Sequence, residues 1–403
     1  MIVVFRSMLF VILSIAVSST VIADAPLPVG DILQASPGEW ELVPEFSDEF
    51  NGDTINSQKW NTNTEDWGTW SWEPENASQN NGSLHLQMVQ QTHQRGNQKL
   101  DYKSGIARTH KTITYGYFEA RVKGCSRFPG ASPAFWLHSK GPQNRYQAKD
   151  GETVTYSEID VIELQQSEYD ALTKQHHGVN HIDCNLHTQL LKNGAKVWIR
   201  PNTNPAMCKN EFVAPWDPRD DYHIYAVENT EDWVVWYIDG KEIGRKPNLY
   251  WHLPMHVTFS LGLRYPFEGY QNGNRVPVHE KTTNDGFPTA MSVDYVRVWQ
   301  NRAAKQSESK INQPQTDKPR IAKPSTAMKP AKNQSSTDTT KADFVAMEKA
   351  KWEKEGWPWN QAKVESNFDE MDTNQDGIAS GLERQAWFEK KRTSLKNDSA
   401  NER

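Results

Sequence analysis

Short runs of alternating apolar and polar residues, separated by turn residues, fill the chain from Trp40 to Trp299. The clearest runs are Ser83 to Val89, Gly116 to Lys123, Tyr156 to Leu164, Asp232 to Ile238, Val257 to Gly262 and Met291 to Trp299. Alternation with a period of two is typical of half-buried β-strands. Asp239-Gly240, between two such runs, is typical of a tight hairpin turn. The pattern predicts an all-β domain, a two-sheet jelly-roll sandwich whose concave sheet can hold a ligand.

One predicted strand carries three acidic residues. They are Glu158, Asp160 and Glu163, in the run Ser157-Glu158-Ile159-Asp160-Val161-Ile162-Glu163-Leu164. Side chains alternate across a strand, so Glu158 and Asp160 share one face, whereas Glu163 has the opposite parity. One extra residue around Val161 and Ile162, accommodated as a β-bulge, would return Glu163 to the face of the other two acids. The strand then presents an acidic row to one cleft.

Such a row fits the hydrolysis of a glycosidic bond with retention of configuration. That reaction needs two carboxyl groups roughly 5 to 5.5 Å apart, one as the nucleophile and one as the acid and then the base. We predict that Glu158 is the nucleophile, that Glu163 is the acid/base, and that Asp160 assists by helping to keep one glutamic acid protonated. The alternatives are a solvent-facing acidic strand edge and a calcium site, because divalent cations also bind clustered carboxylates.

The N-terminal segment, residues 1–23, has the pattern of a secretory signal peptide: a basic residue, an apolar run, and small residues before a cleavage site. We therefore expect a secreted protein, extracellular or periplasmic. No later segment approaches about 18 apolar residues, so stable membrane insertion is not expected. The net charge of −6 gives no support for nucleic-acid binding. An oxidising compartment permits one bridge among Cys125, Cys184 and Cys208; we predict Cys184 to Cys208, with Cys125 as a buried small apolar residue.

The composition changes after the sandwich, which is predicted to span residues 24–301. Residues 302–341 are rich in Pro, Lys, Ser and Thr and lack aromatic residues, which predicts a disordered basic linker. Its positive charge would help to retain a polyanionic polymer, although a plain solvated spacer is the simpler interpretation.

Residues 342–403 are predicted to form a small α-helical module with an EF-hand loop, starting at Asp372-Thr373-Asn374-Gln375-Asp376-Gly377. The predicted calcium ligands are Asp372, Asn374, Asp376, the Ile378 carbonyl and Glu383. Ala379 departs from the pattern, because a larger apolar residue is usual there. The calcium is expected to be structural, and no organic cofactor is predicted. The sequence leaves the partner of this module open.

Several motifs resemble those of a known family. The acidic run, with Tyr115-Gly116-Tyr117-Phe118-Glu119-Ala120-Arg121 and Pro133-Ala134-Phe135-Trp136, resembles glycoside hydrolase family 16, whose members are retaining endo-glycosidases with a concanavalin-like jelly-roll fold. Trp67-Gly68-Thr69-Trp70-Ser71-Trp72, Trp198-Ile199-Arg200-Pro201 and Ser260-Leu261-Gly262-Leu263-Arg264 resemble its κ-carrageenase branch. The resemblance covers residues 36–301 and implies endo-hydrolysis of β-1,4 linkages in κ-carrageenan, a sulfated algal galactan.

A sulfated chain is repelled by a row of carboxylates unless cations pair with its sulfates, and arginine suits this because its planar fork binds oxyanions at two points. Aromatic rings can serve as platforms for sugar rings. The predicted substrate-binding residues are Arg264, Arg200, Trp70, Trp136, Trp198, Trp67 and His187. His187 is equally explained as a structural histidine. The resemblance also implies a calcium ion on the convex face, held by Glu49, the Gly82 carbonyl and Asp294.

Other functions remain open from the sequence. The alternatives are another family 16 enzyme (a furcellaranase, agarase, porphyranase or laminarinase), a lectin that binds sulfated galactan without cutting it, and a calcium-dependent adhesion factor. The insertion from Gln166 to Asp183 contains His176, His177 and His181. We predict a flexible polar loop there, with a metal site as the alternative.

Overall fold

The computed structural model describes residues 26–141, 143–170, 173–272, 274–302, 339–354, 360–372 and 377–379. The chain divides into two units, Met1–Gln315 and Thr316–Arg403. The predicted signal peptide and most of the predicted linker lie outside the described residues, as do Asn374, Asp376 and Glu383 of the predicted calcium loop. Within the described part of the chain, no helix has both the length and the apolar character needed to cross a membrane.

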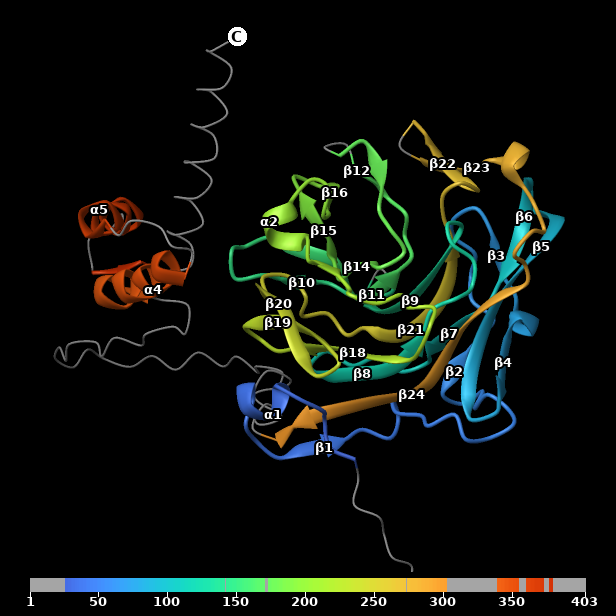
Figure 1. Ribbon diagram of the computed structural model, residues 1–403, viewed down its shortest axis with the longest axis horizontal. Helices are drawn as coiled ribbons and strands as arrows, with labels where there is room; N and C mark the ends of the chain where they lie inside the picture. The colour runs from blue at the N-terminus through green and yellow to red at the C-terminus, as the bar shows by residue number, and fades with distance from the viewer. Residues whose placement is uncertain are drawn as a thin grey trace, which may run out of the picture. The chain divides into compact units, whose positions relative to one another are not determined.

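Two large antiparallel sheets form the first unit and confirm the predicted sandwich (Figure 1). The first sheet contains β1 (Trp40–Leu42), β3 (Ser71–Trp72), β4 (Ala77–Asn80), β5 (Ser83–Arg95), β6 (Gln98–Ser104), β8 (Gly116–Lys123), β18 (His223–Asn229), β19 (Trp233–Ile238), β20 (Lys241–Pro247) and β24 (Thr289–Asn301). Its order is β20-β19-β18-β8-β24-β5-β6-β3, with β1 beside β24 and β4 beside β5. Only β3 and β6 run parallel within the described sheets.

The second sheet carries the acidic strand. It contains β2 (Trp60–Asn61), β7 (Ile106–Thr109), β9 (Ala131–His138), β10 (Tyr146–Gln147), β11 (Thr153–Leu164), β14 (His181–Asp183), β15 (Leu186–Lys192), β16 (Ala195–Ile199), β17 (Glu211–Val213) and β21 (His256–Leu263). Its order is β16-β15-β11-β9-β21-β7-β2, with β10 and β14 beside β11 and β17 beside β14. The acidic strand β11 therefore lies inside the sheet, between β15 and β9.

Small elements complete the first unit. They are α1 (Ile32–Ala35), η1 (Pro74–Asn76), α2 (Pro205–Cys208), η2 (His279–Lys281) and two hairpins, β12 (Tyr169–Asp170) with β13 (Gln175–His176) and β22 (Glu268–Gln271) with β23 (Asn274–Pro277). The predicted hairpin at Asp239-Gly240 joins β19 to β20, and both residues have positive φ, 47° and 73°. Asp and Gly tolerate this conformation, which explains why they occupy the turn.

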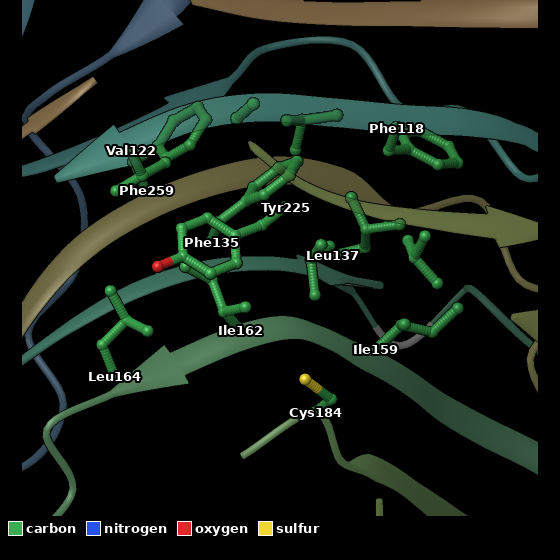
Figure 2. Close-up of a cluster of buried hydrophobic side chains, with 14 of the residues drawn as sticks. Phe118, Val122, Phe135, Leu137, Ile159, Ile162, Leu164, Cys184, Tyr225 and Phe259 are labelled. Carbon is green, nitrogen blue, oxygen red and sulfur yellow. The ribbon is translucent and has the colours of Figure 1, made fainter. Parts of the chain in front are cut away.

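Apolar side chains from both sheets fill the space between them. Figure 2 shows Phe118 and Tyr225, from β8 and β18, near Phe135 of β9 and Ile162 of β11. Trp236 and Trp299 are 0% exposed, whereas Trp233 is only partly buried against the core. Burial of this apolar surface, at about 25 cal/mol per Å², is the main term that stabilises the sandwich.

The predicted Cys184–Cys208 disulfide is wrong, because Cys125, Cys184 and Cys208 are all free and buried. Cys184 points into the core near Ile162 (Figure 2), where it packs as an apolar side chain. Burial raises the pKa of Cys125 to about 11, so this thiol stays protonated near neutral pH. The prediction that Cys125 is a buried small apolar residue is confirmed.

The second unit has its own small core. Helices α4 (Lys341–Lys354) and α5 (Gln361–Met371) pack through Phe344, Phe368 and neighbouring apolar residues. Strand β25 (Thr339–Thr340) pairs with β26 (Ile378–Ala379). The backbone N–H of Gly377 donates a 2.9 Å hydrogen bond to Asp372 Oδ2.

Candidate active site

Strand β11 contains the predicted bulge. Asp160 pairs with Trp136 of β9, whereas Ile162 pairs with the adjacent Phe135, so Val161 is the extra residue. A regular strand would have turned Glu163 toward the core, and the bulge re-aims it.

The same offset appears on the opposite side of β11. Ile159 pairs with Leu186 of β15, and Glu163 pairs with Asp183 of β14. Between these pairs, β11 advances four residues while the neighbouring segment advances three. The extra residue is therefore a property of β11 itself and is not compensated by either neighbour.

The register places all three acids on the face of the sheet that points away from the core. Glu158, Asp160 and Glu163 lie opposite His138, Trp136 and Ala134 of β9. These three β9 residues alternate with Phe135 and Leu137, which lie in the core. Because residues two apart share a face of a strand, the three acids share one face as well.

Glu158 is held by two polar neighbours. The Tyr156 hydroxyl, two residues earlier on the same face, donates a hydrogen bond to Glu158 Oε2. Burial, followed by the charge of Glu158, raises the pKa of Tyr156 well above its usual value, so the hydroxyl remains a donor. On the next strand, His187 Nε2 lies 3.8 Å from Glu158 Oε1. These contacts orient the carboxylate predicted to be the nucleophile.

Asp160 and His187 form a buried pair. Asp160 Oδ2 lies 3.2 Å from His187 Nε2, and the Asp160 side chain is only 4% exposed. Burial, with the nearby charges of Glu163 and Glu158, raises the pKa of Asp160 to about 8. Burial lowers the pKa of His187, but the charges of Glu158 and Asp160 outweigh it and raise that pKa to about 9. The core residue Trp236 also donates to the Asp160 carbonyl at 2.9 Å.

Arg264 lies beside the other glutamic acid. Its Nη2 donates a 2.9 Å hydrogen bond to Glu163 Oε1, its Nε donates to Gln166 Oε1, and its Nη1 donates to the Leu263 carbonyl at 2.9 Å. The Arg264 side chain is 12% exposed. The position of Gln166 was not predicted, because it follows β11 between two residues of positive φ, where strand alternation gives no guide.

Aromatic side chains flank the acids on both sides. Trp136 stacks on His138 with ring centroids 4.3 Å apart and donates to Ser260 Oγ at 3.1 Å. Trp67 lies edge-on to Trp136 at 6.1 Å. On the other side, Trp198 is 40% exposed. Trp136, Trp67 and Trp198 remain predicted sugar platforms.

Arg200 extends the aromatic side of the cleft at Trp198. Its guanidinium lies 4.1 Å from the centre of the Trp198 ring, and that ring contacts Tyr156 edge-on at 5.3 Å. Arg200 itself is exposed. An exposed cation beside an aromatic face and a half-buried tyrosine is available to an anionic sugar.

The burial of Trp70 contradicts its predicted role in substrate binding. Its side chain is 2% exposed and belongs to the main core, where it packs edge-on to Trp72 with centroids 5.3 Å apart. A ring enclosed in this way has no free face for a sugar. Trp67, Trp70 and Trp72 are too close in sequence for motif reasoning to separate the partly exposed ring from the two buried ones.

The two carboxylates of the predicted convex-face calcium site are each paired with an arginine. Arg297 binds Glu49 through two hydrogen bonds of 2.8 and 2.9 Å. Arg121 Nη1 donates to Asp294 Oδ2 at 2.7 Å. A calcium ion would have to displace both guanidinium groups, so these contacts weigh against that prediction.

Clustered carboxylates can also bind cations, which was the alternative interpretation of the acidic strand. The ligand atoms of Glu158, Asp160 and His187 lie within 4.8 Å of one another. His187 would contribute a nitrogen ligand to such a site, whereas calcium prefers oxygen ligands. The buried Asp160–His187 pair therefore fits proton chemistry better.

Comparisons with known proteins show the family to which this chain belongs. A family model described as "Beta-porphyranase A-D, GH16 domain" matches residues 40–301. The κ-carrageenase of Pseudoalteromonas carrageenovora is 44% identical over 277 residues, which cover 66% of this chain and 66% of that enzyme. The match thus leaves about a third of each protein unaligned.

Solved structures of κ-carrageenases are also similar to this chain. A crystal structure of the Pseudoalteromonas carrageenovora κ-carrageenase with an oligotetrasaccharide of κ-carrageenan has a TM-score of 0.59 and 40% identity, covering 66% of this chain and 96% of that chain. A κ-carrageenase from Zobellia galactanivorans has a TM-score of 0.61 and 36% identity, covering 66% and 97%. With the family model, the sandwich and the bulged acidic strand in agreement, this chain belongs to glycoside hydrolase family 16.

Proposed function

We propose that this protein is a secreted, retaining endo-glycosidase that hydrolyses β-1,4 linkages in κ-carrageenan. The observation that carries the proposal is the bulge at Val161, which puts Glu158, Asp160 and Glu163 on one cleft face, next to Arg264. Similarity to κ-carrageenases of known structure supports the substrate class.

In the proposed reaction, a Glu158 oxygen attacks the anomeric carbon while Glu163 gives its proton to the departing glycosidic oxygen. The resulting glycosyl ester is then cleaved by water, whose proton returns to Glu163 and whose oxygen joins the anomeric carbon. Tyr156 and His187 hold the attacking carboxylate in place. Asp160, as a neutral hydrogen-bond donor, would stabilise the negative charge that returns to Glu158 when the ester is cleaved.

Arg264 provides the proposed link between substrate charge and chemistry. Its guanidinium is hydrogen-bonded to Glu163 of the catalytic row, and its side chain is 12% exposed. A sulfate that binds Arg264 competes with Glu163 Oε1 for the same donor. Binding of a correctly sulfated sugar would therefore free Glu163 for the glycosidic oxygen.

Porphyran, also a sulfated galactan, is the second candidate substrate. It is favoured by the description of the family model that matches residues 40–301. The 44% identity with a κ-carrageenase over 277 residues is the reason to place κ-carrageenan first.

The deciding experiment measures release of reducing ends by the purified protein on κ-, ι- and λ-carrageenan, agarose, porphyran and laminarin. The Glu158→Gln variant, which keeps the size of the side chain, is the matched control. We expect release from κ-carrageenan alone, lost in the control. Release mainly from porphyran, agarose or laminarin would keep the mechanism and replace the substrate.

The same digests test the mechanism and the lectin alternative. Proton NMR of the first product formed should show retention of the β-configuration, and inversion would exclude Glu158 as a nucleophile. Binding to κ-carrageenan without release from any polymer would favour a lectin.

A further inference from the structure

The insertion between β11 and β14 brings two histidines beside a carboxylate from another strand. His177 follows β13, His181 begins β14, and Glu211 begins β17. Their ligand atoms all lie within 4.8 Å of one another. The two imidazole rings stack with centroids 3.7 Å apart, and His181 Nε2 is 3.8 Å from Glu211 Oε1.

Polar atoms in this cluster are buried without hydrogen-bond partners. Considering the described residues only, His177 Nδ1, His181 Nδ1 and Asp183 Oδ1 are in this state. The Asp183 side chain is 3% exposed, and its Oδ1 points at His181 Nδ1 from 3.8 Å. Buried polar groups are almost always satisfied in proteins, so three unsatisfied atoms at one place indicate a ligand.

We propose that His177, His181 and Glu211 bind a divalent transition-metal ion of the zinc class. Two imidazoles and one carboxylate are a donor set that zinc accepts, with a fourth position left for water. Asp183 would act as a positioning residue. Metal-bound histidines usually donate their second ring N–H to a carboxylate, and Asp183 Oδ1 is placed to receive that of His181.

Lys209 competes with the proposed metal. Its Nζ lies 2.7 Å from Glu211 Oε1, and its side chain is 41% exposed. The ammonium group therefore has open solvent into which it can move when a cation binds Glu211. This pairing makes a directional prediction, because removing the lysine charge should favour the metal.

The site would fix the insertion next to the catalytic row. Across the sheet, Asp183 pairs with Glu163 of β11 on one side and with Glu211 of β17 on the other. The same insertion carries His176, whose ring stacks at 3.9 Å on Tyr265, the residue after Arg264. A metal at His177 and His181 would thus hold a loop that borders the sulfate-binding arginine.

The test is zinc titration of the full-length mature protein, purified without a histidine tag and kept in excess calcium so that oxygen-rich sites are filled. Calorimetry gives the affinity, and elemental analysis gives the stoichiometry. We expect one zinc equivalent in the wild type and a loss of affinity on the order of 100-fold in His177→Ala/His181→Ala. His176→Ala, which changes the adjacent histidine of the same insertion, should bind like the wild type.

Two further measurements guard against a folding artefact. Cobalt bound to the wild-type protein should give the visible absorption of a four-coordinate nitrogen and oxygen site, without mutation. Lys209→Met should bind zinc at least as tightly as the wild type. Zinc affinity that is equal in the wild type and the double-histidine variant, or weaker binding in Lys209→Met, would overturn the proposal.

Discussion

Asp160 and His187 both have raised pKa values in the folded protein. They lie 3.2 Å apart, and both keep their protons in the folded protein to a higher pH than in the unfolded chain. Two groups this close titrate as a pair, so each step of proton loss belongs to the couple rather than to one residue. Because His187 also lies 3.8 Å from Glu158, the pair is well placed to respond when the charge on Glu158 changes.

This pair predicts that stability falls as pH rises. The pKa of Asp160 rises from 3.8 to about 8, and that of His187 from 6.5 to about 9. Between about pH 6.5 and pH 8 the folded protein holds more protons on this pair than the unfolded chain does, so raising the pH favours unfolding, by at most about 1.4 kcal/mol per pH unit for each proton retained. Urea unfolding from pH 6.5 to 8 should show a shallower decline in Asp160→Asn than in the wild type. Parallel declines would contradict the assignment.

If Arg264 binds a substrate sulfate, its contribution to oligosaccharide binding should depend on that sulfate. In a Glu158→Gln background, which prevents turnover, we expect Arg264→Met to weaken the binding of κ-carrageenan oligosaccharides by about tenfold to 100-fold, as for loss of one charge-assisted hydrogen-bonding group. Calorimetry at several salt concentrations measures the effect, whose salt dependence should shrink in the variant. Desulfated oligosaccharides are the control, because their binding should not change. An equal loss on both ligands would mean that Arg264 acts only through Glu163.

At the level of elements, the bulge in β11 is the feature on which the site depends. Removing Val161 would leave Asp160, Ile162 and Glu163 in regular alternation, in register with β9 and β14. The acids would keep their face but lose the local bend. We therefore expect deletion of Val161 to give a folded protein whose activity is reduced by on the order of 100-fold or more, since small misplacements of catalytic groups have effects of this size.

Circular dichroism measures whether the Val161 deletion variant folds, and reducing-end release measures its activity. Val161→Ala is the matched control, because it removes core methyl groups while keeping the extra residue; Val161 is 1% exposed. The control should lose stability, by about 1 to 3 kcal/mol, and keep most of its activity. A deletion variant as active as the control would show that the bend is dispensable.

Strand β11 shows which features of the site could be predicted from the sequence. The shared face of Glu158 and Asp160 follows from strand alternation, and the bulge follows from the parity of Glu163. The register of β11 against β9 confirms the bulge, because Val161 has no partner there. The burial of Trp70 and the free state of Cys184 did not follow. Both depend on which distant strands pack together, and short motifs carry no information about that.

Within the site, the contact of Tyr156 could be predicted from the sequence, and that of Gln166 could not. Tyr156 lies two residues before Glu158, so strand alternation alone could have placed it beside that carboxylate. Gln166 reaches Arg264 from an irregular segment flanked by positive φ angles, where no periodicity applies. Strand alternation therefore predicts side-chain positions up to the end of β11 but not in the irregular segment that follows it.

At the scale of the whole molecule, the chain consists of two units with separate cores. Every residue of the proposed catalytic row lies in the first unit. In the second unit, the Gly377 N–H donates to Asp372 Oδ2, and Thr340 pairs with Ile378; both contacts are compatible with the EF-hand loop predicted from the sequence. We propose that this loop binds a structural calcium ion.

This division predicts that catalysis and calcium binding separate. A protein truncated after Arg302 should hydrolyse short oligosaccharides as fast as the full-length protein, because its core and its acids are complete. In the full-length protein, calcium should raise the melting temperature of the second unit, since a ligand that binds only the folded state stabilises it. Asp372→Ala should abolish that shift and leave hydrolysis unchanged, as followed by calorimetry and reducing-end release. Loss of hydrolysis on truncation would instead favour an adhesion factor led by the second unit.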